Sequence, residues 1–128
     1  MKRYIIMGSM ILLAWSSSLA QQGSRSSPAV VRNGGDSTQY ELLVTDPGFE
    51  PWFLQNYSPA ADRTNEYYRS KNLVGVANWN DFYHAGRYPL VIDTHIDYWP
   101  QVDYGIDLNR KLYYYFRYVR ATYKIDLF

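Results

Sequence analysis

Four aspartates and one histidine lie between positions 93 and 107, and these side chains are the best suited in the sequence to acid–base or metal chemistry. Asp93, His95 and Asp97 occupy alternate positions, so in an extended strand they share one face at steps of about 7 Å. Two carboxylates and an imidazole can bind Zn²⁺ or a harder cation when a fourth ligand, such as Asp103, completes the site. The competing interpretation is the solvated face of a half-buried strand, which needs no ligand.

Calcium binding and hydrolytic chemistry fit this stretch poorly. A calcium loop needs ligands at alternate positions around a glycine and a bidentate acid at its end, whereas Trp99-Pro100 interrupts the segment. The sequence lacks the usual serine and zinc hydrolase motifs, and its two histidines are His84 and His95. Glycoside hydrolysis by paired carboxylates stays open, because spacing along a chain does not fix the separation of carboxyl groups in space. We predict no cofactor.

Arginines and tyrosines gather near the C-terminus on the polar side of a predicted helix. Guanidinium groups stack on aromatic rings and pair with anions, so such a face can bind phosphates, acidic glycans or a partner protein. The candidate binding residues are Arg110, Tyr113, Tyr114, Arg117, Arg120 and Lys124. An ordinary solvated helix face is the alternative.

The sequence is 18% aromatic and contains no cysteine. Large aromatic side chains are one way in which a small domain without disulfides builds enough core. Trp52, Trp79 and Trp99 can form either a stacking platform for sugar rings or part of that core, and the size of the domain favours the core.

The first twenty residues predict an export signal. Lys2 and Arg3 precede a mostly apolar run from Tyr4 to Trp15, and Ser18-Leu19-Ala20 fits a cleavage site. The apolar run is shorter than the roughly 20 residues that span a bilayer, which disfavours a retained membrane helix. We therefore expect a periplasmic or extracellular protein without stable membrane insertion.

The absence of cysteine excludes disulfides, thiolate metal sites and a lipid anchor on cysteine at the cleavage point. Cleavage after Ala20 leaves eleven basic residues against twelve acidic ones, a net charge of −1. Such a balance disfavours nucleic acid and leaves recognition to local patches. The expected partner is an envelope protein or a glycan.

Residues 21–38 are rich in Ser, Gly and Gln and predict a flexible linker, which leaves 39–128 as one small domain. Residues 40–45 predict a buried strand, ended by the turn signal Asp46-Pro47-Gly48. Residues 49–57 predict a short helical turn.

A helix capped by Ser58, with Pro59 at its first position, is predicted to run to Asn72. Residues 73–83 predict a kinked or broken helix around Gly75, and residues 90–98 predict a half-buried strand.

The last segment predicts the clearest element, a helix that starts at Asp103 or Asp107 and ends at Ile125. Either aspartate can serve as the N-cap, with the other near the positive end of the helix dipole, which explains both without a ligand. The predicted core-facing stripe consists of Leu108, Leu112, Tyr115, Phe116, Val119 and Tyr123.

Several short motifs spread over residues 40–123 form a recognisable pattern. They are Asp46-Pro47-Gly48-Phe49, Trp79-Asn80, Ile96-Asp97-Tyr98 with Pro100, Asp103-Tyr104-Gly105, Asn109, Lys111-Leu112-Tyr113 and Tyr115-Phe116. On these motifs the chain resembles a family of short exported proteins, mostly from Bacteroidota, that is known only as a domain of unknown function.

The sequence departs from this pattern at Asn78, where an acid is usual, at Arg110, where an aromatic residue is usual, and at Asp107, where glutamate is common. Many members of this family resemble lipoproteins, whereas this chain has no cysteine to carry a lipid. The resemblance implies no activity or cofactor. It favours Asp103 as the helix start, because glutamate is a poor N-cap.

We therefore predict a single α+β domain in which a short sheet packs on helices, including a long amphipathic C-terminal helix. The predicted function is a non-enzymatic envelope interaction or binding module. The alternative is a small hydrolase or metal-dependent enzyme that uses the carboxylates from Asp93 to Asp107.

Overall fold

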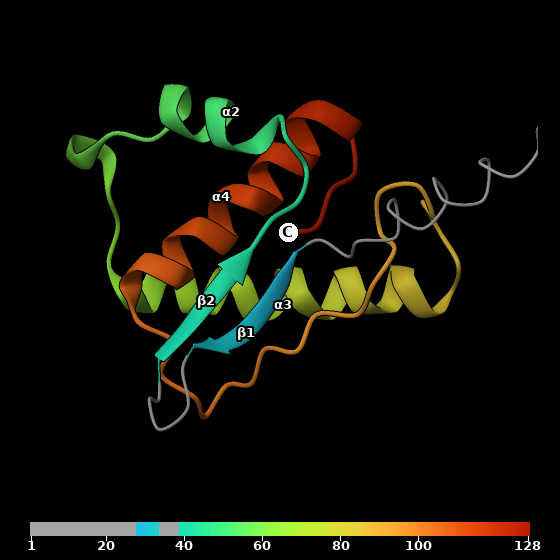
Figure 1. Ribbon diagram of the computed structural model, residues 1–128, viewed down its shortest axis with the longest axis horizontal. Coiled ribbons are helices and arrows are strands. Elements are labelled where there is room, and N and C mark those ends of the chain that lie inside the picture. The colour runs from blue at the N-terminus through green and yellow to red at the C-terminus, as the bar shows by residue number, and fades with distance from the viewer. Residues whose placement is uncertain (1–27, 34–38) are drawn as a thin grey trace, which may run out of the picture.

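The computed structural model describes residues 28–33 and 39–128. The predicted export signal and residues 21–27 and 34–38 of the predicted linker lie outside this part of the chain. The described elements, in chain order, are β1 (Ala29–Asn33), β2 (Gln39–Leu43), α2 (Phe49–Asn56), the 3₁₀ turn η1 (Pro59–Ala61), α3 (Asn65–His84) and α4 (Ile106–Tyr123) (Figure 1). The predicted α+β class with a long C-terminal helix is confirmed.

Helix α4 is the centre of the fold. It contacts α3, α2 and β2, and α3 lies across it on the side away from α2 (Figure 1). The connection from α3 to α4 runs back alongside α3, and residues 124–128 turn back into the core, where Ile125 and Leu127 are buried. Because α4 is covered on two sides, its buried surface is wider than a single stripe.

Strand β1 corrects the predicted linker, because residues 29–33 pair with β2 in an antiparallel hairpin. Ala29 lies opposite Leu43 and Val30 opposite Leu42, and both Val30 and Leu42 pack against the core. A strand in the predicted range 40–45 is confirmed as β2, which ends at Leu43, but the strand is not buried as predicted, because Tyr40 and Leu42 are half-buried and Leu43 is 43% exposed. Its Tyr40 ring packs edge-on against Tyr104, with ring centroids 4.9 Å apart.

Helix α3 begins later than predicted and does not break. The Thr64 hydroxyl oxygen accepts a hydrogen bond from the Tyr67 backbone N–H at 3.1 Å, so Thr64 is the N-cap. The side chain of Ser58 makes no cap hydrogen bond, and Pro59 starts only the short turn η1. The helix then continues through Gly75 to His84.

Gly75 permits close packing of α3 on α4 instead of breaking α3. A β-carbon at this position would lie 2.5 Å from Cδ2 of Phe116, which is itself 1% exposed. The predicted kink is therefore wrong, because the glycine is required by a neighbouring helix and not by the local backbone.

Gly75→Ala is expected to lower the free energy of unfolding by about 1 to 2 kcal/mol, since the buried Phe116 ring must move to admit the methyl group. Without this contact, alanine would raise the free energy of unfolding by about 1 kcal/mol, because it is the better helix former. The sign of the measured change therefore tests whether Gly75 packs against Phe116. Urea unfolding measures the change, and a stabilised variant would contradict this contact between the helices.

Residues 90–98 do not form the predicted strand: residues 89–91 lie in a turn and residues 92–98 form an irregular segment. No strand in the described part of the chain pairs with them. The alternation itself is partly confirmed. Ile92, Ile96 and Tyr98 are buried, whereas Leu90, also predicted to face inward, is 97% exposed.

Side chains of α3 take the place of a partner strand. The Ile96 N–H donates to Oδ1 of Asn80 at 2.8 Å, and Nδ2 of Asn80 donates to the Ile96 carbonyl at 3.0 Å. Nε1 of Trp79 donates to the Thr94 carbonyl at 2.6 Å. A side-chain amide can thus satisfy the hydrogen-bonding groups of an extended backbone, as a neighbouring strand does.

Helix α4 starts at Ile106, one residue before the predicted start at Asp107, but neither Asp103 nor Asp107 is its N-cap. Gly105 is the N-cap with φ of 87°, a conformation that glycine adopts readily. Asp103 Oδ1 accepts a hydrogen bond from the Gly105 N–H, which shapes the turn before the helix. The helix ends at Tyr123 because Lys124 is left-handed, with φ of 62°.

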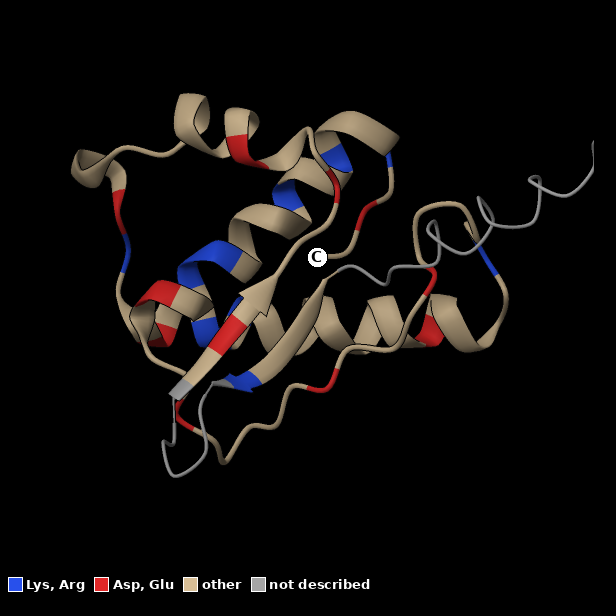
Figure 2. Cartoon of the chain, viewed as in Figure 1, with Lys and Arg blue, Asp and Glu red and all other residues tan. Residues whose placement is uncertain are grey.

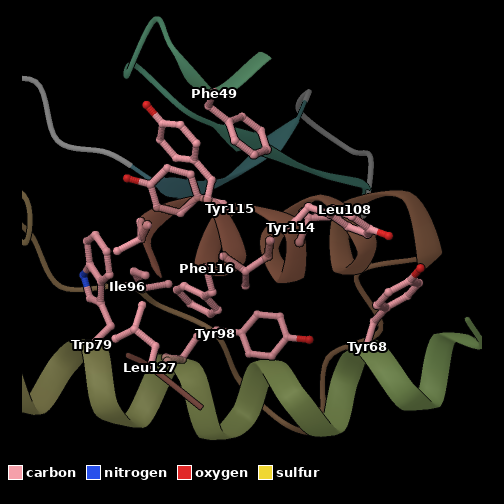
Figure 3. Close-up of a cluster of buried hydrophobic side chains, with 14 of the residues drawn as sticks. Phe49, Tyr68, Trp79, Ile96, Tyr98, Leu108, Tyr114, Tyr115, Phe116 and Leu127 are labelled. Atoms are coloured by element: carbon pink, nitrogen blue, oxygen red, sulfur yellow. The ribbon is translucent and has the colours of Figure 1, made fainter. Parts of the chain in front are cut away.

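The core lies on both sides of α4. Figure 3 shows Trp79, Tyr98 and Phe116 between α3 and α4, and Phe49 and Tyr115 on the opposite side of α4. The predicted stripe of α4 is confirmed except for Tyr123, which is 38% exposed. No helix in the described residues is both long enough and apolar enough to cross a membrane.

The three tryptophans occupy different environments. Trp79 is fully buried, as predicted, and Trp52 is half-buried with its ring centroid 5.7 Å from that of Tyr118. Trp99 is 55% exposed, so its predicted place in the core is wrong. A turn begins at the adjacent Pro100.

Candidate functional site

The carboxylates between Asp93 and Asp107 do not converge on a metal site. Asp93, His95 and Asp97 are all exposed, and Nδ1 of His95 lies 3.3 Å from Oδ1 of Asp97. Asp103 lies in the turn before α4 and accepts the Gly105 N–H. Across residues 28–33 and 39–128, no three or more His, Asp or Glu side chains are arranged to hold a metal ion.

The six residues of the predicted binding face are divided among several environments. Arg110 is paired with Asp62 and Asp107, and Tyr114 is only 4% exposed. Arg120 lies 3.8 Å from Asp126, and the Lys124 ammonium donates to the Ala121 carbonyl. The structure therefore does not bring the six together as one exposed face.

Arg110 belongs to a partly buried ionic network that fastens the segment before α3 to α4. Its Nη2 lies 2.7 Å from Oδ2 of Asp62, and its Nε donates to Oδ1 of Asp62 at 3.0 Å. The Tyr68 hydroxyl donates to the same carboxylate. Hydrogen bonding to Arg110 holds the pKa of Asp62 well below its usual range, while burial and Asp62 raise the pKa of Tyr68 to about 12.

Asp46 plays a similar structural part at the other end of α4. It accepts hydrogen bonds from the Gly48 N–H at 3.0 Å and from the Tyr118 hydroxyl at 3.1 Å, and a third from the Tyr123 hydroxyl. The hydrogen bond to Asp46 raises the pKa of Tyr123, and burial raises that of Tyr118. The turn between β2 and α2 is thereby fixed to α4.

A different group of residues forms the best candidate site. We call it the basic tyrosine patch, and it consists of Arg63 before α3, Tyr67 and Lys71 on α3, and Tyr113 and Arg117 on α4. The ring centroids of Tyr67 and Tyr113 are 5.7 Å apart, which joins the two helices at this point. Lysine and arginine positions recur along α4 (Figure 2).

The three cations of the patch lie over aromatic rings. Arg63 Cζ is 4.5 Å and Lys71 Nζ 5.8 Å from the Tyr67 ring centroid. Arg117 Cζ is 6.0 Å from the Tyr113 ring centroid. Arg117 Cζ is also 5.2 Å from the Tyr114 ring centroid, and Lys71 Nζ is 5.7 Å from that of Phe128. The three charges therefore lie around one cluster of aromatic rings, Tyr67, Tyr113, Tyr114 and Phe128.

No carboxylate in the described part of the chain lies within ion-pair distance of Arg63, Lys71 or Arg117. The nearest acids in sequence are engaged elsewhere, since Asp62 pairs with Arg110 and Glu66 with Arg69. Arg63 and Arg117 are exposed and Lys71 is half-buried. The patch therefore concentrates positive charge that the described residues do not neutralise.

The two phenols of the patch differ in acidity. Interaction with the neighbouring Tyr113 side chain lowers the pKa of Tyr67 despite its partial burial. Arg63, Lys71 and Arg117 lower it further. Burial raises the pKa of Tyr113 to about 12. The positive charges around Tyr67 therefore favour its ionised form.

Sequence reasoning found Tyr113 and Arg117 but missed Arg63, Tyr67 and Lys71. The available signal was the spacing of four residues from Arg63 to Tyr67 and from Tyr67 to Lys71, which aligns side chains along one side of a helix. A pattern on one helix does not reveal this patch, because the patch forms where α3 and α4 meet.

A protein-family model matches residues 4–128, nearly the whole chain. The predicted resemblance to a family of unknown function is thereby confirmed. The bacterial phylum of that family stays a prediction. No curated protein and no solved structure matches the chain.

Proposed function

The chain belongs to the family of unknown function DUF6146, and we propose from its site that it is a non-enzymatic binding module of the cell envelope. On this proposal the protein is exported, and the basic tyrosine patch holds an acidic group of an envelope glycan or protein. The proposed binding site is therefore this patch, in place of the polar face of α4 that was predicted from the sequence.

The observation that carries the proposal is the gathering of three cations without carboxylate partners in the described residues. Of the other cations in these residues, Arg69, Arg110, Lys111 and Arg120 each have an acidic partner, whereas Arg32, Arg87 and Lys124 have none in the described part of the chain. Like charges held close together repel one another, and a bound anion relieves the repulsion. Cations and aromatic faces bind such groups without a chemical step.

The test compares two pairs of substitutions that remove the same charge. Full-length protein is bound to immobilised heparin, an acidic glycan probe, with neutral dextran as the reference. Arg63→Gln with Arg117→Gln is expected to weaken binding about tenfold or more, because two charge-assisted contacts are lost. Arg32→Gln with Arg120→Gln is the control and is expected to change binding by less than about twofold.

Equal losses in the two pairs would show that overall charge, and not the patch, controls binding. Heparin binding no stronger than dextran binding would also contradict the proposal. Photo-cross-linking in the producing cell, with the reactive group at the exposed Ser70 beside the patch, tests the envelope role. A glycan or envelope protein is the expected product, and cross-linking only to cytosolic proteins would overturn that role.

A further inference from the structure

We propose that the turn after α3 and the residues at the end of α4 form a contact site for the surface of an anionic lipid bilayer. This site is separate from the basic tyrosine patch, so the proposal goes beyond the proposed function. It follows from a leucine that is almost fully exposed, from an apolar hollow beside it, and from two cations next to the hollow.

Leu90 is the most exposed large apolar side chain in the described residues, at 97%. It lies on a turn that backbone hydrogen bonds hold in place, since the Tyr88 carbonyl accepts from the N–H groups of Val91 and Ile92 at 2.9 and 2.8 Å. Tyr88 has φ of 52°, a left-handed conformation that is uncommon outside glycine. Such a conformation persists only where the surrounding structure fixes it, so the turn presents Leu90 to solvent in a defined way.

A shallow, mostly apolar hollow of about 320 Å³ includes Leu90 in its wall. Its lining joins two segments that are distant in sequence, residues 88–91 of the turn and Tyr123 and Ile125 at the end of α4. Tyr88 and Tyr123 are each 38% exposed. Single exposed apolar side chains are ordinary, whereas a contiguous group of them marks a contact surface. Leucine and tyrosine are also the residue types that enter the boundary between lipid headgroups and acyl chains.

Two cations adjoin the hollow. The Arg87 guanidinium lies over the Tyr88 ring, with Cζ 5.1 Å from the ring centroid, and Lys124 stands in the chain between the lining residues Tyr123 and Ile125. Neither cation has a carboxylate within ion-pair distance in the described part of the chain. Residues 87–93 and 120–126 together hold three basic and two acidic side chains, so the surroundings carry a net positive charge. This sign favours anionic lipids.

The extent of this surface favours a bilayer over a protein partner. A stable protein interface takes about 20 to 30 residues from each side, whereas six residues line the hollow. A bilayer requires no complementary shape, because a leucine can enter the acyl region alone while arginine and lysine keep their charged ends at the headgroups. One leucine and two cations give weak attachment, so the contact is a reversible one.

Flotation with vesicles measures the contact. Protein purified from the producing cell is mixed with vesicles of phosphatidylcholine, with or without phosphatidylglycerol as the anionic lipid. Leu90→Asn is expected to weaken binding to the anionic vesicles about tenfold or more, because its apolar side chain no longer leaves water. Leu54→Asn is the matched control, since Leu54 is 75% exposed on α2 and lies outside the hollow. Equal losses for the two variants would overturn the proposal, and thermal melting confirms that both are folded.

Removal of charge separates this site from the basic tyrosine patch. Arg87→Gln with Lys124→Gln is expected to weaken binding to anionic vesicles at least about tenfold and to leave binding to pure phosphatidylcholine unchanged. Arg63→Gln with Arg117→Gln removes the same charge from the patch and should weaken vesicle binding by less than about twofold. The opposite order of effects would place the lipid contact at the patch and overturn the proposal, whatever the outcome with heparin.

A dye at position 90 reports whether this side chain enters the bilayer. Because the chain has no cysteine, Leu90→Cys and Leu54→Cys each accept a polarity-sensitive thiol dye at one position. Anionic vesicles should shift the emission of the dye at position 90 to shorter wavelength and leave that at position 54 unchanged. No shift at position 90 would overturn the proposal. Photo-cross-linking from position 90 to a protein, without vesicle binding, would also overturn it and would identify a protein as the occupant.

Discussion

Trp79→Ala is expected to lower the free energy of unfolding by about 4 kcal/mol, the largest effect of any single substitution considered. The Trp79 ring is completely buried between α3 and α4, where it packs against Tyr115 and Phe116 (Figure 3). Truncation to alanine removes this apolar contact and leaves a cavity, which together cost about 3 to 5 kcal/mol. The substitution also leaves the Thr94 carbonyl without its Nε1 donor.

Urea unfolding followed by circular dichroism measures this loss. Trp99→Ala is the matched control, since Trp99 is 55% exposed and the same change in type should cost less than about 1 kcal/mol. Trp79→Phe separates packing from hydrogen bonding, and it is expected to cost about 2 kcal/mol because a ring remains but the Thr94 carbonyl loses its partner. Similar losses for Trp79→Ala and Trp99→Ala would contradict the described burial.

Local patterns predicted those parts of the fold that are fixed by local interactions. The helical repeat of Leu108, Leu112 and Phe116 predicted α4, and all three are buried. The alternation in residues 90–98 likewise predicted that Ile92 and Ile96 face inward. In both cases the pattern reports which side of the chain is apolar, and burial follows from the hydrophobic effect.

The wrong predictions concern interactions between residues that are distant in sequence. Gly75 has a local signal for a helix break, but its actual role depends on Phe116 of another helix. Strand β1 depends on pairing with β2, and the polar composition around Val30 hid its strand character. The backbone of Ile96 forms hydrogen bonds with the side chain of Asn80 instead of with a strand. Sequence patterns for strand pairing do not predict such a contact.

Only part of the candidate site could be predicted, again because the rest depends on contacts between residues that are distant in sequence. Tyr113 and Arg117 lie on the polar side of α4 and were recognised from that helix alone. Tyr67 and Lys71 come from α3, and their place beside Tyr113 follows from how the two helices cross. Tyr114 was taken for an exposed residue, but α4 is covered on two sides and this ring is buried.

Arg110→Met is expected to lower the free energy of unfolding by about 3 kcal/mol at neutral pH. Methionine keeps most of the length and apolar surface of arginine but leaves the Asp62 carboxylate without its cation. Removing one partner of a buried ion pair costs about 3 to 5 kcal/mol, and the side chains of Arg110 and Asp62 are 16% and 25% exposed, which places the effect at the lower end. Arg120→Met is the control, because its exposed pair with Asp126 should contribute less than about 1 kcal/mol.

The pH dependence of the same variant gives an independent test. Arg110 depresses the pKa of Asp62 in the folded protein, so the stabilisation is complete above the pKa of about 3.9 of an unfolded aspartate and is lost as the pH falls below it. The difference in stability between the wild type and Arg110→Met should therefore shrink progressively below about pH 4. Asp62→Asn should remove most of this acid dependence from the wild type. A difference that stays constant from neutral to acidic pH would mean that Arg110 stabilises α4 by packing and not through Asp62.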